Sequence, residues 1–218
     1  MKFKDRKEAG YLLSKEIKKL NLEEIQLLAI PRGGVPVAFE ISKQLACPMS
    51  LWLAKKIGHP TNSEFAIGAV SKDSVILNEN SGVSKEYIEN KINELKKEIE
   101  IKRKRFNLLE KRISLEGKNL ILVDDGIATG NSMLACIQSL MKEQPAKLFV
   151  AIPVAPVRAI KKIKELVDGI ICLHEAEIFF GVGAFYDDFS QVSDEEVIAC
   201  LKEIQSSHFE IKNEVIIK

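Results

Sequence analysis

Apolar residues gather in short runs along this chain, and stretches with apolar residues at helical spacing separate the runs. An uninterrupted apolar run is typical of a strand that is buried on both faces of a parallel sheet. Such runs predict strands at 27–30, 49–54, 120–123, 147–153 and 169–173. Spacings of three and four residues predict helices at 5–19, 37–45, 133–140 and 159–167. This alternation predicts an α/β fold with a mainly parallel sheet that is covered by helices.

The segment after the second predicted strand follows a different pattern. It spans residues 55–64, begins with Lys55 and Lys56, and continues with Gly, Pro, Asn and Ser. This composition favours a mobile basic loop. The alternative is the solvated tip of a hairpin. Two short strands are expected next, at 65–70 and 74–77.

Two further helices and a tail complete the pattern. Ser84 is the predicted cap of a long helix that reaches about residue 113, with a break near 102–105. Ser193 opens a capping box for a final helix to about residue 205, and the tail from 206 is interpreted as an edge strand. We expect a single domain spanning 1–218. It would consist of a core at about 20–175, a long helical insertion at about 84–113, and a small hood with the C-terminal region at about 176–218.

Composition and charge narrow the classes of function. The 218 residues carry a net charge of +1, which gives no electrostatic case for binding nucleic acid or a membrane. The dense basic run at 102–105 follows interleaved glutamates and is interpreted as a solvated helix face. No apolar run approaches the ~20 residues of a membrane span, and the first residues do not resemble a signal peptide. We therefore expect a cytoplasmic protein with reduced thiols at Cys47, Cys136, Cys172 and Cys200.

The segment 119–133 carries the most specific chemistry. An apolar strand ends in Asp124 and Asp125, and a loop of small residues then leads into a helix. Glycine and hydroxyl residues let a backbone curl closely around an anion, toward which the first N–H groups of the helix point. Carboxylates at the end of a strand can accept hydrogen bonds from vicinal hydroxyls or hold a hydrated divalent cation. A site for phosphate beside a diol indicates a sugar phosphate as the ligand.

Other phosphate motifs do not fit this segment. The loop has no Lys beside Gly130, which disfavours a nucleoside-triphosphate P-loop, and it is not Gly-x-Gly-x-x-Gly. A simpler interpretation is a turn common in α/β proteins, in which Thr129 only caps the helix. The remainder of the pattern decides between these interpretations.

The segment Ile-Leu-Val-Asp-Asp-Gly-Ile-Ala-Thr-Gly-Asn-Ser resembles the donor-binding signature of the type I phosphoribosyltransferases. The resemblance extends over nearly the whole chain to a subfamily of phosphoribosyltransferase-domain proteins. It implies that the ribose and 5-phosphate of 5-phosphoribosyl-1-diphosphate (PRPP) contact Asp124, Asp125, Gly126, Ala128, Thr129, Gly130, Asn131 and Ser132. Asp124 and Asp125 would hold the ribose hydroxyls and stabilise positive charge at the reacting carbon.

A second strand–loop–helix unit supplies a positive, glycine-rich turn at Arg32, Gly33 and Gly34. Alone, this turn is a weak signal. The resemblance assigns the diphosphate of PRPP to it, together with Lys55 and Lys56. It also implies that a flexible loop near Lys55 closes over the reacting centre and excludes water, with Lys56 as a catalytic residue that neutralises the leaving group.

The aromatic segment 177–194 is predicted by default to be a satellite core. The resemblance implies a variable hood over the acceptor base, in which Phe180 or Tyr186 stacks on the base and Asp187 or Asp188 contacts metal. The implied cofactor is Mg²⁺, which would be held mostly by PRPP and water.

The implied reaction transfers the phosphoribosyl group from PRPP to a nitrogen acceptor, such as a nucleobase, in nucleotide salvage. Relatives that act on 6-oxopurines carry an acidic residue where this chain has Ala128, so that class of acceptor is disfavoured. The expected partners are PRPP, a base-like acceptor and a second copy of the chain, to which the long helix could contribute an interface.

Two alternatives stay open. One is a regulator that senses PRPP or a nucleotide without catalysis, and the other is a metal-dependent phosphosugar hydrolase that uses the same loops. The sequence shows no third acidic cluster for a dedicated metal site, which weighs against the hydrolase.

Overall fold

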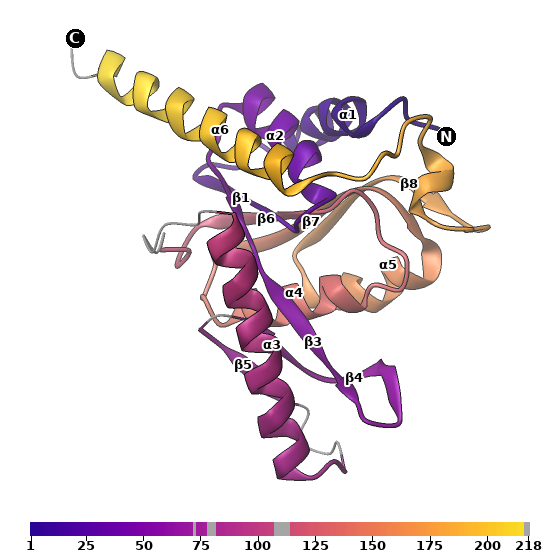
Figure 1. The fold of residues 1–218 in the computed structure, drawn as a ribbon. Coiled ribbons are helices and arrows are strands. Elements are labelled where there is room, and N and C mark those ends of the chain that lie inside the picture. The colour runs from indigo at the N-terminus through magenta and orange to yellow at the C-terminus, as the bar shows by residue number, and fades with distance from the viewer. Residues whose placement is uncertain (72, 78–81, 107–113, 216–218) are drawn as a thin grey trace.

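Five parallel strands form the central sheet, in the order β2-β1-β6-β7-β8. The computed structural model describes residues 1–71, 73–77, 82–106 and 114–215 (Figure 1). The strands of the central sheet are β1 Ile25–Ala29, β2 Met49–Leu51, β6 Asn119–Val123, β7 Lys147–Pro156 and β8 Gly169–Ala176. The mainly parallel sheet predicted from the apolar runs is confirmed.

Helices cover both faces of this sheet (Figure 1). One face packs against α1 Arg6–Lys18, α2 Gly34–Leu45 and α6 Asp194–Val215. The other face packs against α4 Asn131–Met141 and α5 Val157–Ile163, which continues as the 3₁₀ turn η1 Lys164–Leu166. In β6, Ile121 faces the first layer and Leu122 the second, because successive side chains of a strand point to opposite faces. This explains why the strand is apolar at every position from Leu120 to Val123.

A second, antiparallel sheet corrects one expectation. Residues 55–64 were expected to form a mobile loop, but they lie mostly in the hairpin of β3 Ala54–His59 and β4 Asn62–Ser71. The strand β5 Val75–Leu77 completes this sheet. Backbone pairing with β4 overrides the local loop signal, and only the tip around Pro60 and Thr61 is a turn.

The long helix α3 Lys85–Arg105 packs on this hairpin through Leu95 and Ile99, and together they project from the central sheet (Figure 1). The Ser84 hydroxyl accepts a hydrogen bond from the Tyr87 N–H at 3.3 Å, as its predicted role as a cap requires. The helix ends at Arg105, with Phe106 as its C-cap, at the end of the stretch where a break was expected. Residues 107–113 lie outside the described part of the chain.

The C-terminal region corrects another expectation. Ser193 and Glu196 form the predicted capping box, in which the Ser193 N–H donates to the Glu196 carboxylate at 2.7 Å and the Glu196 N–H donates to the Ser193 hydroxyl at 3.2 Å. The helix then runs to Val215, so residues 206–215 are helical and do not form an edge strand. None of the described helices is long and apolar enough to cross a membrane.

Candidate active site

Two loops meet at the carboxyl edge of the central sheet because β1 and β6 are neighbours. Ala29 is in register with Val123, and the Ile30 N–H donates to the Val123 carbonyl at 2.9 Å. The diphosphate loop, defined as residues 31–34, follows β1. The acidic pair and the phosphate loop, defined as residues 124–125 and 126–132, follow β6. The residues predicted for the donor therefore lie on adjacent segments.

The glycines of the diphosphate loop allow it to touch the acidic pair. A Cβ atom on Gly33 would lie 2.0 Å from an Asp125 carboxylate oxygen. A Cβ atom on Gly34 would lie 2.6 Å from the Val123 carbonyl oxygen. Both distances are too short for any side chain, so this approach requires glycine. The peptide bond between Pro31 and Arg32 is cis.

The two carboxylates of the acidic pair differ in their surroundings. Asp124 is half-buried, and its carboxylate accepts a hydrogen bond from the Asp125 N–H at 2.9 Å. Burial and the nearby charge of Asp125 raise the pKa of Asp124 well above its usual range. Burial also raises the pKa of Asp125, but the hydrogen bond and charge of Arg6 oppose that shift.

Arg6 of α1 anchors Asp125, a role that the sequence did not reveal. Its Nε donates to the Asp125 carboxylate at 2.8 Å, and these side chains are only 11% and 13% exposed. The guanidinium also donates to the Ser190 carbonyl at 2.8 Å and lies 3.9 Å from the centroid of the Phe189 ring. No local signal identifies Arg6, which stands in the first turn of a helix far from the motif.

The phosphate loop has the geometry of an anion site. Gly126 has φ +154°, and a Cβ atom there would lie 2.6 Å from Val182. Gly130 has φ +82° and precedes α4, so the backbone turns sharply into the helix N-terminus. Thr129 and Ser132 are exposed, and no side chain caps this helix. Thr129 is therefore not the cap that the simpler interpretation required.

The cations of the site are held by carboxylates from two helices. Arg32 lies 3.5 Å from Asp194, at the start of α6. Lys55 of β3 forms an ion pair with Glu98 of α3. Lys56 is the next residue of the same strand, so the two lysines point to opposite faces of the hairpin. The structure therefore separates a pair that the sequence placed together.

The hood residues take different positions. Tyr186 is 4% exposed, packs against Phe3, and donates its hydroxyl to the Asp125 carbonyl at 2.7 Å. Its ring offers no open face, so the expectation that it stacks on a base is corrected to a structural role. Phe180 is 91% exposed and remains available as a stacking surface. Phe179 and Phe185 belong to the apolar cluster beneath the hood.

The carboxylates of the site differ in how well they suit a metal ion. Asp188 is exposed, and its carboxylate accepts a hydrogen bond from the Ser190 N–H at 2.9 Å, which lowers its pKa. No group of three or more metal-ligating residues occurs among the described residues. The partly exposed carboxylate of Asp124 is a hard oxygen donor with a neighbouring negative charge. It fits an ion that takes most of its ligands from substrate and water, as Mg²⁺ commonly does.

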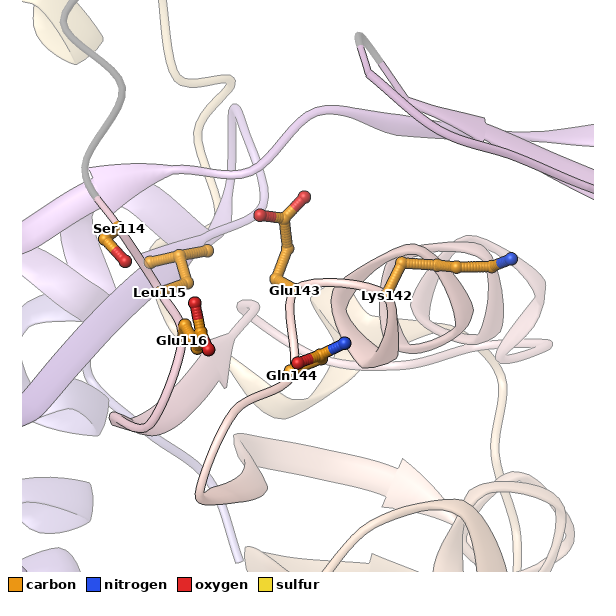
Figure 2. Close-up of a pocket in the computed structure, with 6 residues that line it drawn as sticks. All are labelled: Ser114, Leu115, Glu116, Lys142, Glu143 and Gln144. Carbon is orange, nitrogen blue, oxygen red and sulfur yellow. The ribbon is translucent and has the colours of Figure 1, made fainter.

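Two shallow depressions lie at the opposite, amino edge of the sheet. One of about 450 Å³ is lined by residues 114–116 and 142–144, which precede β6 and β7 (Figure 2). The other, of about 510 Å³, is lined by residues that include Ile25, Pro48 and Lys118. Ligands of open parallel sheets bind at the carboxyl ends of the strands, so neither depression is the candidate site.

The fold and the loops together define a class of protein. A parallel sheet that is covered by helices on both faces, with an acidic pair and two glycine-containing loops at its carboxyl edge, is an α/β domain of the kind that binds its ligand at that edge. Comparison with known proteins then gives the family. The phosphoribosyl transferase domain matches residues 5–189, and the chain belongs to this family.

Individual relatives agree with this assignment. Two Mycobacterium tuberculosis proteins, each bearing the provisional name of a phosphoribosyl transferase, are 36% identical over 204 residues, which cover 91% of this chain. The chain spans 46% of the length of these relatives. The crystal structure of TT1426 from Thermus thermophilus matches with a TM-score of 0.88 and 35% identity, covering 93% of this chain and 99% of that one.

Proposed function

We propose that this chain transfers the 5-phosphoribosyl group of PRPP to a ring nitrogen or amine of a nucleobase-like acceptor. The bond between C1 of the ribose and the diphosphate breaks, a bond between C1 and nitrogen forms, and the acceptor loses a proton. The observation that carries the proposal is the contact between Gly33 and Asp125, because it joins a diphosphate loop to an acidic pair. Family membership supports the choice of donor.

Different residues bind the different groups of PRPP. In the proposal, the phosphate loop binds the 5-phosphate through the first amides of α4 and the hydroxyls of Thr129 and Ser132. Asp124 faces the ribose hydroxyls and stabilises the positive charge that develops on C1. Asp125 is held by Arg6, and so fixes the position of the two loops. The diphosphate loop and Arg32 receive the leaving group.

Mg²⁺ would neutralise charge on the diphosphate, and Asp124 would supply a carboxylate oxygen to hold it. Without a bound ligand, burial and Asp125 raise the pKa of Asp124. A cationic ligand or a positive ribosyl centre would reduce the repulsion between the carboxylates of Asp124 and Asp125. The acidic pair is thus suited to bind a positively charged group in place of water.

One residue of the phosphate loop narrows the class of acceptor. Ala128 is exposed and carries no group that could exchange a proton with a 6-oxopurine. We propose an acceptor outside that class, bound beneath a hood to which Phe180 contributes. A role in nucleotide salvage, a homodimer and a cytoplasmic location are parts of the same proposal.

The test mixes the purified chain with PRPP and Mg²⁺, adds a panel of bases, and follows diphosphate release and nucleotide formation. Nucleotide formed from one base, with stoichiometric diphosphate, is the expected result. Tight PRPP binding without product indicates a sensor instead, and ribose phosphate released without regard to the base indicates a hydrolase. Either of the last two results contradicts the proposal.

A further inference from the structure

The basic run 102–105 has a place in the structure that its composition did not predict. Glu98, Lys102 and Arg105 are spaced four and three residues apart, so they share one face of α3. Glu98 pairs with Lys55 of β3, and Arg105 pairs with Asp194 of α6 at 3.2 Å. This face of α3 is therefore turned toward the candidate site and not only toward solvent.

Arg105 and Arg32 share a single carboxylate. The Arg32 guanidinium lies 3.5 Å from one oxygen of Asp194, and the Arg105 guanidinium lies 3.2 Å from the other. A carboxylate bridged by two guanidiniums occupies the position that an oxygen pair of a phosphate would take. Because Arg32 belongs to the diphosphate loop, Arg105 lies within reach of the same ligand.

Lys102 adds a half-buried charge to this group. Burial lowers the pKa of Lys102, and so do the positive charges of Lys55 and Arg32, whereas Asp194 and Glu98 oppose the shift. The cluster thus holds four cations (Arg32, Lys55, Lys102 and Arg105) and two carboxylates. Arg105 is 61% exposed, but Lys102 is half-buried beside the positive charges of Lys55 and Arg32. Such a charge is unfavourable unless an anion lies against it.

We propose that Lys102 and Arg105 of α3 are further binding residues for the condensed diphosphate of the donor, and that Asp194 holds their place until the diphosphate displaces it. The inference rests on the proposed function. A diphosphate is favoured over a single carboxylate or phosphate because its charge and its several oxygens can satisfy guanidinium and ammonium groups from two elements together.

The test is calorimetric titration of the full chain with inorganic diphosphate and Mg²⁺, and separately with ribose 5-phosphate. Lys102→Met and Arg105→Gln are each expected to weaken diphosphate binding about tenfold, the loss of one charge-assisted hydrogen bond. Ribose 5-phosphate binding should stay within about twofold, since it depends on the phosphate loop. Lys104→Gln is the matched control, because Lys104 belongs to the same run but to another face of the helix.

Asp194→Asn separates a binding role from a merely structural one. If Asp194 competes with the ligand, its neutralisation tightens diphosphate binding about threefold. Thermal unfolding of each variant is the check that the variant still folds. The inference is overturned if Lys102→Met and Arg105→Gln bind diphosphate as Lys104→Gln does, or if Asp194→Asn binds it no more tightly than the wild type. A wild-type chain that binds neither ligand overturns the proposed function itself.

Discussion

The Asp125 carboxylate is held by a guanidinium that lies 119 positions away in the sequence. Local pattern identified Asp125 as part of the donor signature and predicted a helix for the segment that contains Arg6. The pattern could not show that the two residues form an ion pair. The sequence in the first turn of an amphipathic helix does not indicate which strand end that turn will contact. The same limit applies to Tyr186, whose aromatic character is as compatible with a buried hydrogen bond as with base stacking.

Removal of the Arg6 side-chain charge should lower the stability of the folded protein. Arg6→Gln leaves the mostly buried Asp125 carboxylate without its cation, and loss of one partner of a buried ion pair is expected to lower the free energy of unfolding by about 3 kcal/mol. Urea unfolding at pH 7 measures the change.

Lys7→Gln provides the control for this measurement. Lys7 is the next residue of the helix and is exposed, so its substitution should change stability by less than about 0.5 kcal/mol. Equal stability of the two variants would contradict the anchoring role of Arg6.

The ionisation of Asp124 predicts a dependence of stability on pH. The pKa of Asp124 is raised in the folded protein, which therefore binds this proton more tightly than the unfolded chain does. The free energy of unfolding should fall as the pH rises from about 4, the unfolded value, through the raised pKa.

The side chain at position 124 cannot ionise in the Asp124→Asn variant. The variant should therefore not lose this stability as the pH rises. The variant should be more stable than the wild type at pH 7, and its advantage should shrink toward pH 4. Chemical unfolding across this pH range measures both. An advantage that grows on acidification would show that the pKa of Asp124 is lowered in the folded protein.

At the scale of elements, the apolar runs predicted the buried strands because a parallel strand is apolar on both faces. The strand β3 was expected to be a loop because it is stabilised by pairing with β4 and by packing against α3, and not by its own composition. Lys55, Lys56, Gly58 and Pro60 all favour a loop when the segment is considered alone. The helical residues 206–215 were missed for a related reason: the pattern beyond residue 205 was too short to specify a period.

Hydrogen exchange distinguishes the hairpin from a mobile loop. Backbone amides of β3 that pair with β4 should exchange at least about 100-fold more slowly than those of an unstructured peptide, because they open only with the sheet. Mass spectrometry of peptides from this segment measures the rate. Exchange at the rate of an unstructured peptide would restore the mobile-loop interpretation.

At the scale of the whole molecule, the order of strands and loops along the chain fixes where the site must be. The carboxyl ends of β1 and β6 meet at one edge of the sheet, so the two loops that the sequence singled out become neighbours. The sequence could not show that α3 and α6 also reach this edge. Their contribution depends on packing between elements that are far apart in the chain, as the shared contact of Arg32 and Arg105 with Asp194 illustrates.

In the proposed function, the phosphoribosyl group is transferred at the edge of the sheet that bears Asp124. The most direct measurement compares the rate of diphosphate release from PRPP by the wild type and by Asp124→Asn, with Mg²⁺ and an accepted base. The variant should be about 10²–10³-fold slower, since it loses the charge that stabilises the ribosyl centre, while it remains folded. Undiminished release by a folded Asp124→Asn variant would contradict the assignment.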